Sequence, residues 1–147
     1  RSQEDVDALI KALSSGIIDC IATDHAPHNI ERKDCEFQEA SFGISGLETA
    51  VAVIMDKLVH TKLLSINNMV KLFTTGPCQV LGVQPSSLSP GCKGDITIID
   101  PLIIRDVDTS KFYSKGKNTP FKGMNLQGWP WMTIVGGKII AKDGRLV

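Results

Sequence analysis

Three residues that could carry metal or proton-transfer chemistry lie within five positions of one another: Asp24, His25 and His28. They follow an apolar run over residues 17–22, which is too short for a helix and is typical of a strand buried on both faces. A carboxylate at the carboxyl end of such a strand can ligate a metal and accept a proton from metal-bound water. Because Pro27 disfavours a regular helix here, we expect His28 to lie beyond a bend, where it could hold an anionic group of a substrate.

Two other interpretations of these residues stay open at this point. In the first, the carboxylate caps the loop after the strand and the histidines bond the backbone; neither HExxH nor HxH, two spacings typical of catalytic metal sites, occurs in the sequence. In the second, a structural zinc site draws on Cys20, Asp24, His25, His28 and Cys35. The spacing of these five residues fits none of the usual structural zinc patterns.

Hydrophobic spacing predicts the elements that position these residues. The capping-box pattern from Ser2 to Asp5, followed by apolar residues at helical spacing, predicts a helix over residues 3–14. A second helix is expected over 47–60, and a third, capped by Ser65, over 66–73. The other expected elements are an exposed loop over 29–42, a short turn over 76–81, a connector over 85–94, strands over 95–100, 103–107, 131–135 and 138–141, a hairpin turn at Gly136-Gly137 and one more turn at Asp143-Gly144.

The order of these elements predicts an α/β fold in two parts, a mainly helical part over residues 1–82 and a β-rich part over 83–147. The length of 147 residues is too short for a complete (β/α)8 barrel, which needs about 200–250 residues or more. The sequence starts at Arg1, without an initiator methionine or a signal-peptide pattern, so we expect it to be a piece of a longer protein.

Charge and cysteine content argue against several other classes of protein. Sixteen basic and sixteen acidic residues give a net charge of zero, which provides no global attraction to nucleic acid or anionic membranes. No apolar run approaches the roughly 18–20 residues of a membrane span. The four cysteines form no CxxC pair, and we expect reduced thiols and a cytoplasmic location. The basic and aromatic residues over 111–122 could bind an anion or nucleic acid, but we expect them to form a surface segment.

Several motifs then resemble one family. Ile-Ala-Thr-Asp-His-Ala-Pro-His at 21–28 and Phe-Gly-Ile-Ser-Gly-Leu-Glu-Thr at 42–49 resemble the dihydroorotases, metal-dependent hydrolases of the amidohydrolase superfamily. Residues 72–77, 91–100 and 114–123 resemble later motifs of the same family, in the same order. The resemblance covers essentially the whole chain and is strongest to the single-chain bacterial type.

This resemblance implies a fold and a set of site residues. The implied fold is the C-terminal part of a (β/α)8 amidohydrolase barrel over 1–82, followed by part of a small β-sandwich subdomain over 83–147. Asp24 is implied to contact the zinc site and to act as general base and acid in opening and closing the dihydroorotate ring. His28 is implied to bind the substrate carboxylate, and the backbone at Phe42 and Gly43 to contact the substrate ring. His25 belongs to the motif but receives no separate role.

The resemblance also implies zinc as the cofactor of the whole enzyme, a small-molecule substrate and a homo-oligomer that could associate with aspartate transcarbamoylase. The other metal ligands of the family, its HxH pair, carboxylated lysine and two further histidines, have no counterpart in residues 1–147. We therefore expect the isolated chain to be inactive, to bind zinc incompletely and to expose strand edges and apolar surface. Two alternatives remain: an allantoinase- or dihydropyrimidinase-like enzyme, and a metal-free homologue that serves as a structural partner of aspartate transcarbamoylase.

Overall fold

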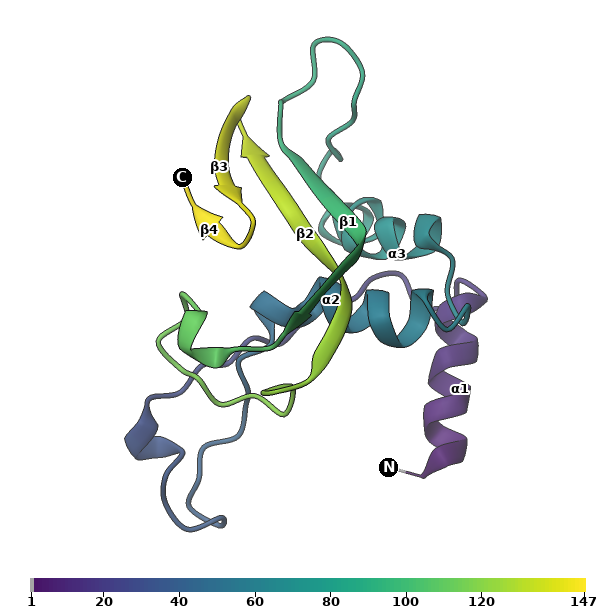
Figure 1. The fold of residues 1–147 in the computed structure, drawn as a ribbon. Helices are drawn as coiled ribbons and strands as arrows, with labels where there is room; N and C mark the ends of the chain where they lie inside the picture. The colour runs from purple at the N-terminus through teal and green to yellow at the C-terminus, as the bar shows by residue number, and fades with distance from the viewer. Residues whose placement is uncertain (1) are drawn as a thin grey trace.

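The computed structural model describes residues 2–147 and combines helices in the first half of the chain with an antiparallel sheet in the second (Figure 1). The α-helices are α1 (Gln3–Ser14), α2 (Ala50–Ile54), α3 (Ile66–Phe73) and α4 (Thr75–Leu81). The strands are β1 (Ile96–Asp106), β2 (Asn125–Val135), β3 (Lys138–Lys142) and β4 (Arg145–Leu146). Short 3-10 turns cover Ile30–Arg32, Leu47–Thr49 and Thr109–Lys111, and a π-helical turn covers Met55–Val59. The mixed α/β content agrees with the predicted fold class.

Helix α1 confirms the predicted bounds and the predicted cap. The Ser2 side chain accepts from the Asp5 backbone N–H, and the Asp5 carboxylate accepts from the Ser2 N–H, so the capping box is complete. The helix stands at one side of the molecule (Figure 1) and buries none of its residues. Leu13 packs against the core, whereas Leu9 is 59% exposed. The apolar stripe of α1 is therefore largely open to solvent, as the expectation of exposed apolar surface anticipated.

The strand predicted over residues 17–22 is wrong for this structure, because that segment is irregular. A strand needs a neighbouring strand for its backbone N–H and C=O groups. Within the described residues, this segment instead runs beside α3, where the Ile21 N–H donates to the Leu72 carbonyl at 3.0 Å. Ile17 is 74% exposed, which also differs from the predicted burial. The apolar composition of residues 17–22 is compatible with a strand. A strand forms only where a neighbouring strand pairs with it, and the composition does not show whether one is present.

The helix predicted over 47–60 is confirmed as a continuous helical stretch, made of a 3-10 turn, α2 and the π-helical turn that ends at Val59. Met55, the first residue of the π turn, is fully buried at the centre of the molecule. One buried cluster contains Met55, Leu64, Met69 and Leu72, and a second contains Ala52, Val107 and Leu126. The helical stretch thus contributes to both clusters and joins the α3 region to the sheet.

Helix α3 has the predicted Ser65 cap, whose side chain accepts from the Asn68 backbone N–H. The predicted turn over 76–81 is instead helix α4. Pro77 does not prevent this helix, because it lies in the first turn, where its missing N–H would have no helical partner. Gly82 ends α4 with a φ of 67°, the left-handed conformation that glycine adopts without steric cost.

The four strands described here form one antiparallel sheet in the order β1-β2-β3-β4. The strands predicted over 95–100 and 103–107 are a single strand, since Pro101 is accommodated at a register shift between Asp100 and Ile104. Strand β2 begins six residues before the predicted 131–135 strand. Both predicted turns are confirmed, with positive φ at Gly136, Gly137, Asp143 and Gly144.

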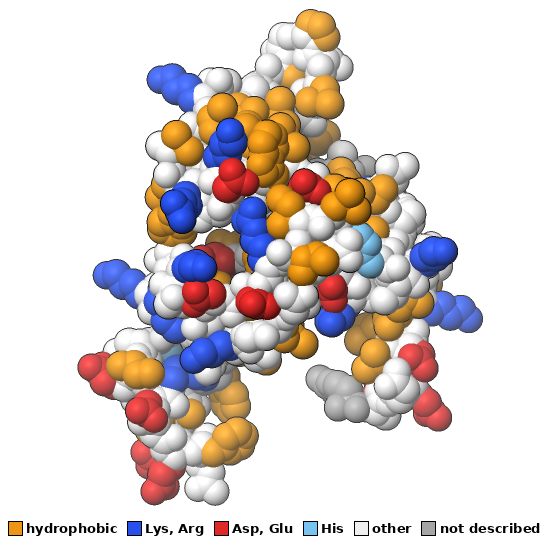
Figure 2. Space-filling model, in the orientation of Figure 1, with side chains coloured by type: hydrophobic (Ala, Val, Ile, Leu, Met, Phe, Trp, Pro, Cys, Tyr) orange, Lys and Arg blue, Asp and Glu red, His pale blue; other side chains and the backbone are white. Residues whose placement is uncertain are grey.

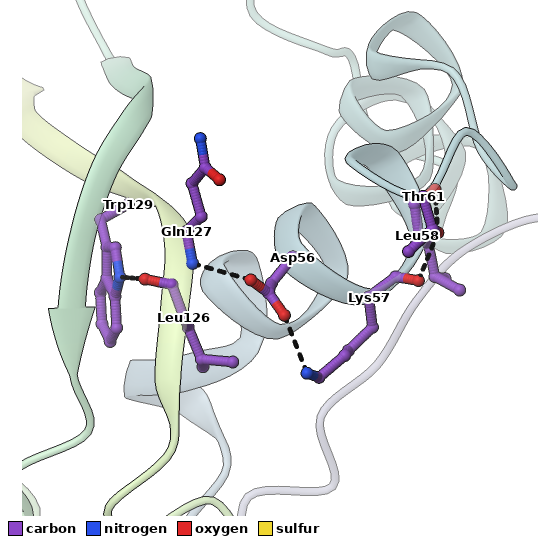
Figure 3. Close-up of polar contacts among 7 residues, drawn as sticks. All are labelled: Asp56, Lys57, Leu58, Thr61, Leu126, Gln127 and Trp129. Atoms are coloured by element: carbon purple, nitrogen blue, oxygen red, sulfur yellow. Dashed lines mark hydrogen bonds and ion pairs between the residues drawn. The ribbon is translucent and has the colours of Figure 1, made fainter.

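The helical stretch over residues 47–59, here called the central helical stretch, contacts β2 in two ways. Asp56 accepts a hydrogen bond from β2, and Met55 packs closely against Gly128. Asp56 accepts from the Gln127 backbone N–H at 3.0 Å and pairs with the Lys57 ammonium at 2.9 Å (Figure 3). The hydrogen bond from Lys57 and the one from the Gln127 N–H hold the pKa of Asp56 below its usual 3.8, against the opposing effect of burial. One residue further along β2, Gly128 has a φ of 95°, and a Cβ there would lie 2.6 Å from the Met55 Cβ.

Acidic and basic side chains are interspersed over the face shown in Figure 2, with apolar side chains between them. None of the helices within residues 2–147 combines the length and the apolar character needed to cross a membrane.

Candidate active site

Three segments that lie far apart in the sequence meet at the start of the helical stretch over residues 47–59. They are the Asp24 segment (residues 23–28), the Gly43 loop (42–49) and the Gly116 segment (112–118). The Ala26 N–H donates to the Ile44 carbonyl at 2.9 Å, which joins the first two. The buried Ser45 donates from its hydroxyl to the Gly116 carbonyl at 2.7 Å, which joins the second and third. These segments overlap three of the motifs that carry the family resemblance, at 21–28, 42–49 and 114–123, so the structure brings those motifs to one place.

The backbone of Asp24 adopts a strained conformation. Its φ is 44°, in the left-handed region that residues with a Cβ rarely occupy. Such strain costs about 1–3 kcal/mol and is concentrated at functional sites. Asp24 is exposed, and the ion pairs found among residues 2–147 involve other carboxylates. The Asp24 carboxylate is therefore accessible to a ligand, a metal or a proton donor.

His28 is held by the Gly43 loop. Its Nε2 lies 2.7 Å from the carbonyl oxygen of Phe42. Because a carbonyl oxygen only accepts, Nε2 must carry the proton and donate it. The other ring nitrogen, Nδ1, remains for a different partner, and a doubly protonated ring could donate to an anionic group from that side. The Phe42 side chain itself is 96% exposed.

Two features of position 43 require glycine: the backbone conformation and the short distance to neighbouring atoms. Its φ is 120°, and a Cβ at this position would lie 2.5 Å from the Ala26 Cβ and 3.3 Å from the His28 Nε2. The Lys33 ammonium donates to the Gly43 carbonyl at 3.1 Å and to the Ser41 carbonyl at 2.7 Å. His28 and Lys33 therefore both hold this loop, through hydrogen bonds to the carbonyl groups of Phe42 and Gly43.

Sequence reasoning missed several residues that build this site. Besides Lys33 and Ser45, they include Glu48, whose carboxylate accepts from the Tyr113 and Ser114 backbone N–H groups, both at 2.9 Å. They also include Ser114, whose hydroxyl lies 3.2 Å from the His25 Nε2. Glu48 and Ser114 lie within the resemblance motifs, but no pattern in the sequence showed that they contact one another.

The described residues do not by themselves form a metal centre. Residues 2–147 contain no group of three or more His, Cys, Asp or Glu side chains placed to hold a metal ion. A catalytic zinc site needs about three protein ligands. His28 Nε2 donates to the Phe42 carbonyl, and both nitrogens of His25 are engaged by protein groups. The Asp24 carboxylate and the His28 Nδ1 are the groups left free at this site, which is fewer than three. The residues present therefore do not fit a complete zinc site.

Comparison with known proteins supports the family indicated by these motifs. The model of the amidohydrolase family matches residues 1–140. The dihydroorotase of Pelotomaculum thermopropionicum is 49% identical over 143 residues, which are 97% of this chain and 34% of that protein. The dihydroorotase of Geobacillus sp. is 46% identical over 145 residues, 99% of this chain and 34% of that protein. The L-hydantoinase of Arthrobacter aurescens superimposes with a TM-score of 0.93 at 32% identity, over 100% of this chain and 34% of the hydantoinase.

The chain belongs to the amidohydrolase family. It spans about a third of the length of the curated relatives it matches, and those relatives are dihydroorotases. Dihydropyrimidinase from Brevibacillus agri, at 23% identity and a TM-score of 0.90, shares the fold.

Proposed function

We propose that the protein containing this chain is a dihydroorotase, which interconverts N-carbamoyl-L-aspartate and L-dihydroorotate by reversible hydrolysis of a cyclic amide. The observation that carries the proposal is the meeting of the Asp24 segment, the Gly43 loop and the Gly116 segment. The names of the relatives at 44–49% identity support it. We prefer this function to that of a hydantoinase because the Arthrobacter aurescens hydantoinase, despite its similar fold, is only 32% identical.

In this proposal Asp24 is the general base and acid and also contacts the metal. Its accessible carboxylate and strained backbone support that role. His28 binds the substrate carboxylate through the Nδ1–H of a doubly protonated ring, since Nε2 donates its proton to the Phe42 carbonyl. The backbone at Phe42 and Gly43 contacts the substrate ring, and the close packing of Gly43 against Ala26 and His28 fixes the position of that backbone.

Zinc is the proposed cofactor of the whole enzyme, where it would polarise the ring amide that is cleaved. Residues 2–147 contain no group of three or more side chains placed to hold a metal ion, so in this proposal most of the metal ligands come from outside these residues. We therefore propose that a polypeptide limited to residues 1–147 neither binds zinc stoichiometrically nor opens dihydroorotate. Metal analysis and a ring-opening assay on this polypeptide test the point, and robust activity would contradict it.

The proposal also includes the domain architecture, the location in the cell, the oligomeric state and the partner. Residues 1–82 would form the C-terminal part of a (β/α)8 barrel and residues 83–147 part of a β-sandwich subdomain. The exposed apolar surface of α1 and of the 17–22 segment supports packing against further barrel elements. We propose a cytoplasmic homo-oligomer that acts on a small molecule, and an association with aspartate transcarbamoylase.

A substrate panel on the full-length protein tests the function. Dihydroorotate, carbamoyl aspartate, hydantoin, dihydrouracil and allantoin would be compared under the same conditions. We expect turnover of the first two. Turnover of hydantoin, dihydrouracil or allantoin without dihydroorotate would contradict the proposal in favour of a related cyclic amidase. If none of the five compounds is turned over, the result would favour the alternative that the protein is a structural partner of aspartate transcarbamoylase.

A further inference from the structure

His25 contacts both segments that pack against the Asp24 segment. Its Nδ1 lies 3.2 Å from the backbone nitrogen of Gly46 and 3.2 Å from that of Leu47, both in the Gly43 loop. Its Nε2 lies 3.2 Å from the hydroxyl oxygen of Ser114, in the Gly116 segment. A single half-buried ring therefore connects three stretches of chain that are separated by about 20 and about 70 residues.

These partners determine the protonation of the ring. Two backbone N–H groups point at Nδ1, so this nitrogen must be an acceptor without a proton. The proton of the neutral ring then resides on Nε2, which donates to the Ser114 hydroxyl. Gly46 has no side chain with which to cap the helical stretch that begins at Leu47. The lone pair of His25 Nδ1 instead accepts from the N–H of Gly46 and from that of Leu47, the first residue of the stretch, whose N–H has no partner within the helix.

We propose that His25 is a positioning residue for the Asp24 carboxylate, acting as the Nε2–H tautomer. The proposal rests on the proposed catalytic role of Asp24. His25 follows Asp24 directly in the chain, so anchoring its ring on both nitrogens limits the backbone freedom of the residue before it. The left-handed φ of Asp24 must be maintained by its surroundings, and the His25 contacts provide that restraint.

Three substitutions in the full-length protein separate the two sides of the ring. His25→Asn keeps an acceptor close to the position of Nδ1 but loses the contact with Ser114, whereas His25→Gln keeps a donor close to Nε2 and loses the acceptor. His25→Ala removes both. His60→Asn is the matched control, because His60 is exposed at the end of the π-helical turn. For each variant we would measure kcat per folded molecule and KM, both with dihydroorotate, and the melting temperature. Long-range proton–nitrogen NMR of histidine-labelled protein would identify the tautomer of His25.

We expect the NMR spectrum to show His25 with its proton on Nε2. Removal of outer supporting contacts typically lowers activity by about 10–100-fold, and we expect His25→Ala and His25→Gln to lose kcat in that range with a smaller change in KM. His25→Asn should recover much of the lost kcat, and His60→Asn should behave as the wild type.

Two results would overturn the proposal: a proton on Nδ1 of His25, or a His25→Ala enzyme whose melting temperature falls while kcat per folded molecule is unchanged. The latter would assign His25 a structural role alone. If the wild-type protein does not turn over dihydroorotate, the proposed function fails. The tautomer and the exchange protection of the Gly46 and Leu47 amides still test the anchoring contacts in that case, and protected amides with an Nε2–H ring would support them.

Discussion

His28 donates its Nε2 proton to the carbonyl oxygen of Phe42 across 2.7 Å, and this bond links two of the motifs of the site. The bond fixes which edge of the imidazole faces the Gly43 loop. It leaves Nδ1 as the edge available to a ligand, and Nδ1 donates to a carboxylate when the ring carries both protons. The proposed contact with the substrate carboxylate therefore has a defined geometry, which substitutions can test.

Replacing His28 by alanine should weaken the binding of the carboxylate. Hydrogen bonds to charged groups contribute about 1.5–3 kcal/mol, so we expect KM for dihydroorotate to rise about 10–100-fold, with a smaller effect on kcat. Dihydrouracil lacks the carboxylate, and any residual turnover of it should respond little to the substitution. Steady-state kinetics with both compounds check this, and an equal loss for the two would show that His28 does not act on the carboxylate.

Replacing Gly43 by alanine should displace the loop that carries Phe42. The new methyl group would lie 2.5 Å from the Ala26 Cβ, at a φ of 120°. Misplacement of a substrate-contacting group by about 1 Å can cost about 100-fold in rate, and we expect a loss of kcat/KM of that order. Gly91→Ala is the control, since its φ is 90° and the methyl group added there would have no atom within 4 Å. Similar activities for the two variants would contradict the close-approach argument.

The ion pair of Asp56 should make stability depend on pH in the acid range. The Lys57 hydrogen bond holds the folded-state pKa of Asp56 below 3.8, so the unfolded chain binds this proton more readily than the folded protein. The contribution is fully present above pH 3.8 and is lost as the pH falls through the folded-state pKa. Asp56→Asn keeps an acceptor for the Gln127 N–H but removes the charge.

We therefore expect wild type to exceed Asp56→Asn in stability at neutral pH by about 0.2–1 kcal/mol, the range for partly exposed pairs. Denaturant unfolding at several pH values measures the difference, which should vanish in acid. A difference that is the same at neutral pH and below the folded-state pKa would rule out the charge as its source.

Packing between β2 and the central helical stretch should depend on Gly128. Both Gly123 and Gly128 have positive φ, but only at Gly128 would an added Cβ meet another atom, the Met55 Cβ at 2.6 Å. We expect Gly123→Ala to cost about 1–2 kcal/mol through its backbone and Gly128→Ala about 2–5 kcal/mol through backbone and overpacking. Thermal or denaturant unfolding of the two variants provides the comparison, and equal losses would show that Met55 can move away at little cost.

Local patterns in the sequence predicted those parts of the fold that depend on local interactions. The Ser2 capping box, the Ser65 cap and the Gly136-Gly137 turn each involve residues within a few positions of one another, and all three are present. The segment over 17–22 was predicted incorrectly because a strand depends on a partner from elsewhere in the chain. Residues 76–81 were predicted as a turn because proline usually ends a helix. They form part of a helix instead, since Pro77 lies in the first turn, where the helix needs no N–H from it.

The candidate site shows the same division. Asp24, His28 and the Phe42-Gly43 pair were identified from the sequence through the family resemblance, and the structure brings their segments together. The supporting contacts of Glu48 and Ser114 were not predicted, because they join residues 66 and 89 positions away from their partners. No local pattern encodes such pairings.

The role of Asp24 is the central claim, and ring opening of dihydroorotate by the full-length protein with Asp24→Asn tests it most directly. Asp34→Asn, in the exposed loop, is the matched control. Loss of a general acid–base group typically costs about 100–10,000-fold, so we predict a fall of at least that size in kcat for Asp24→Asn, with the folded structure retained and Asp34→Asn fully active. An Asp24→Asn enzyme that opens the ring at a rate close to that of the wild type would contradict the account.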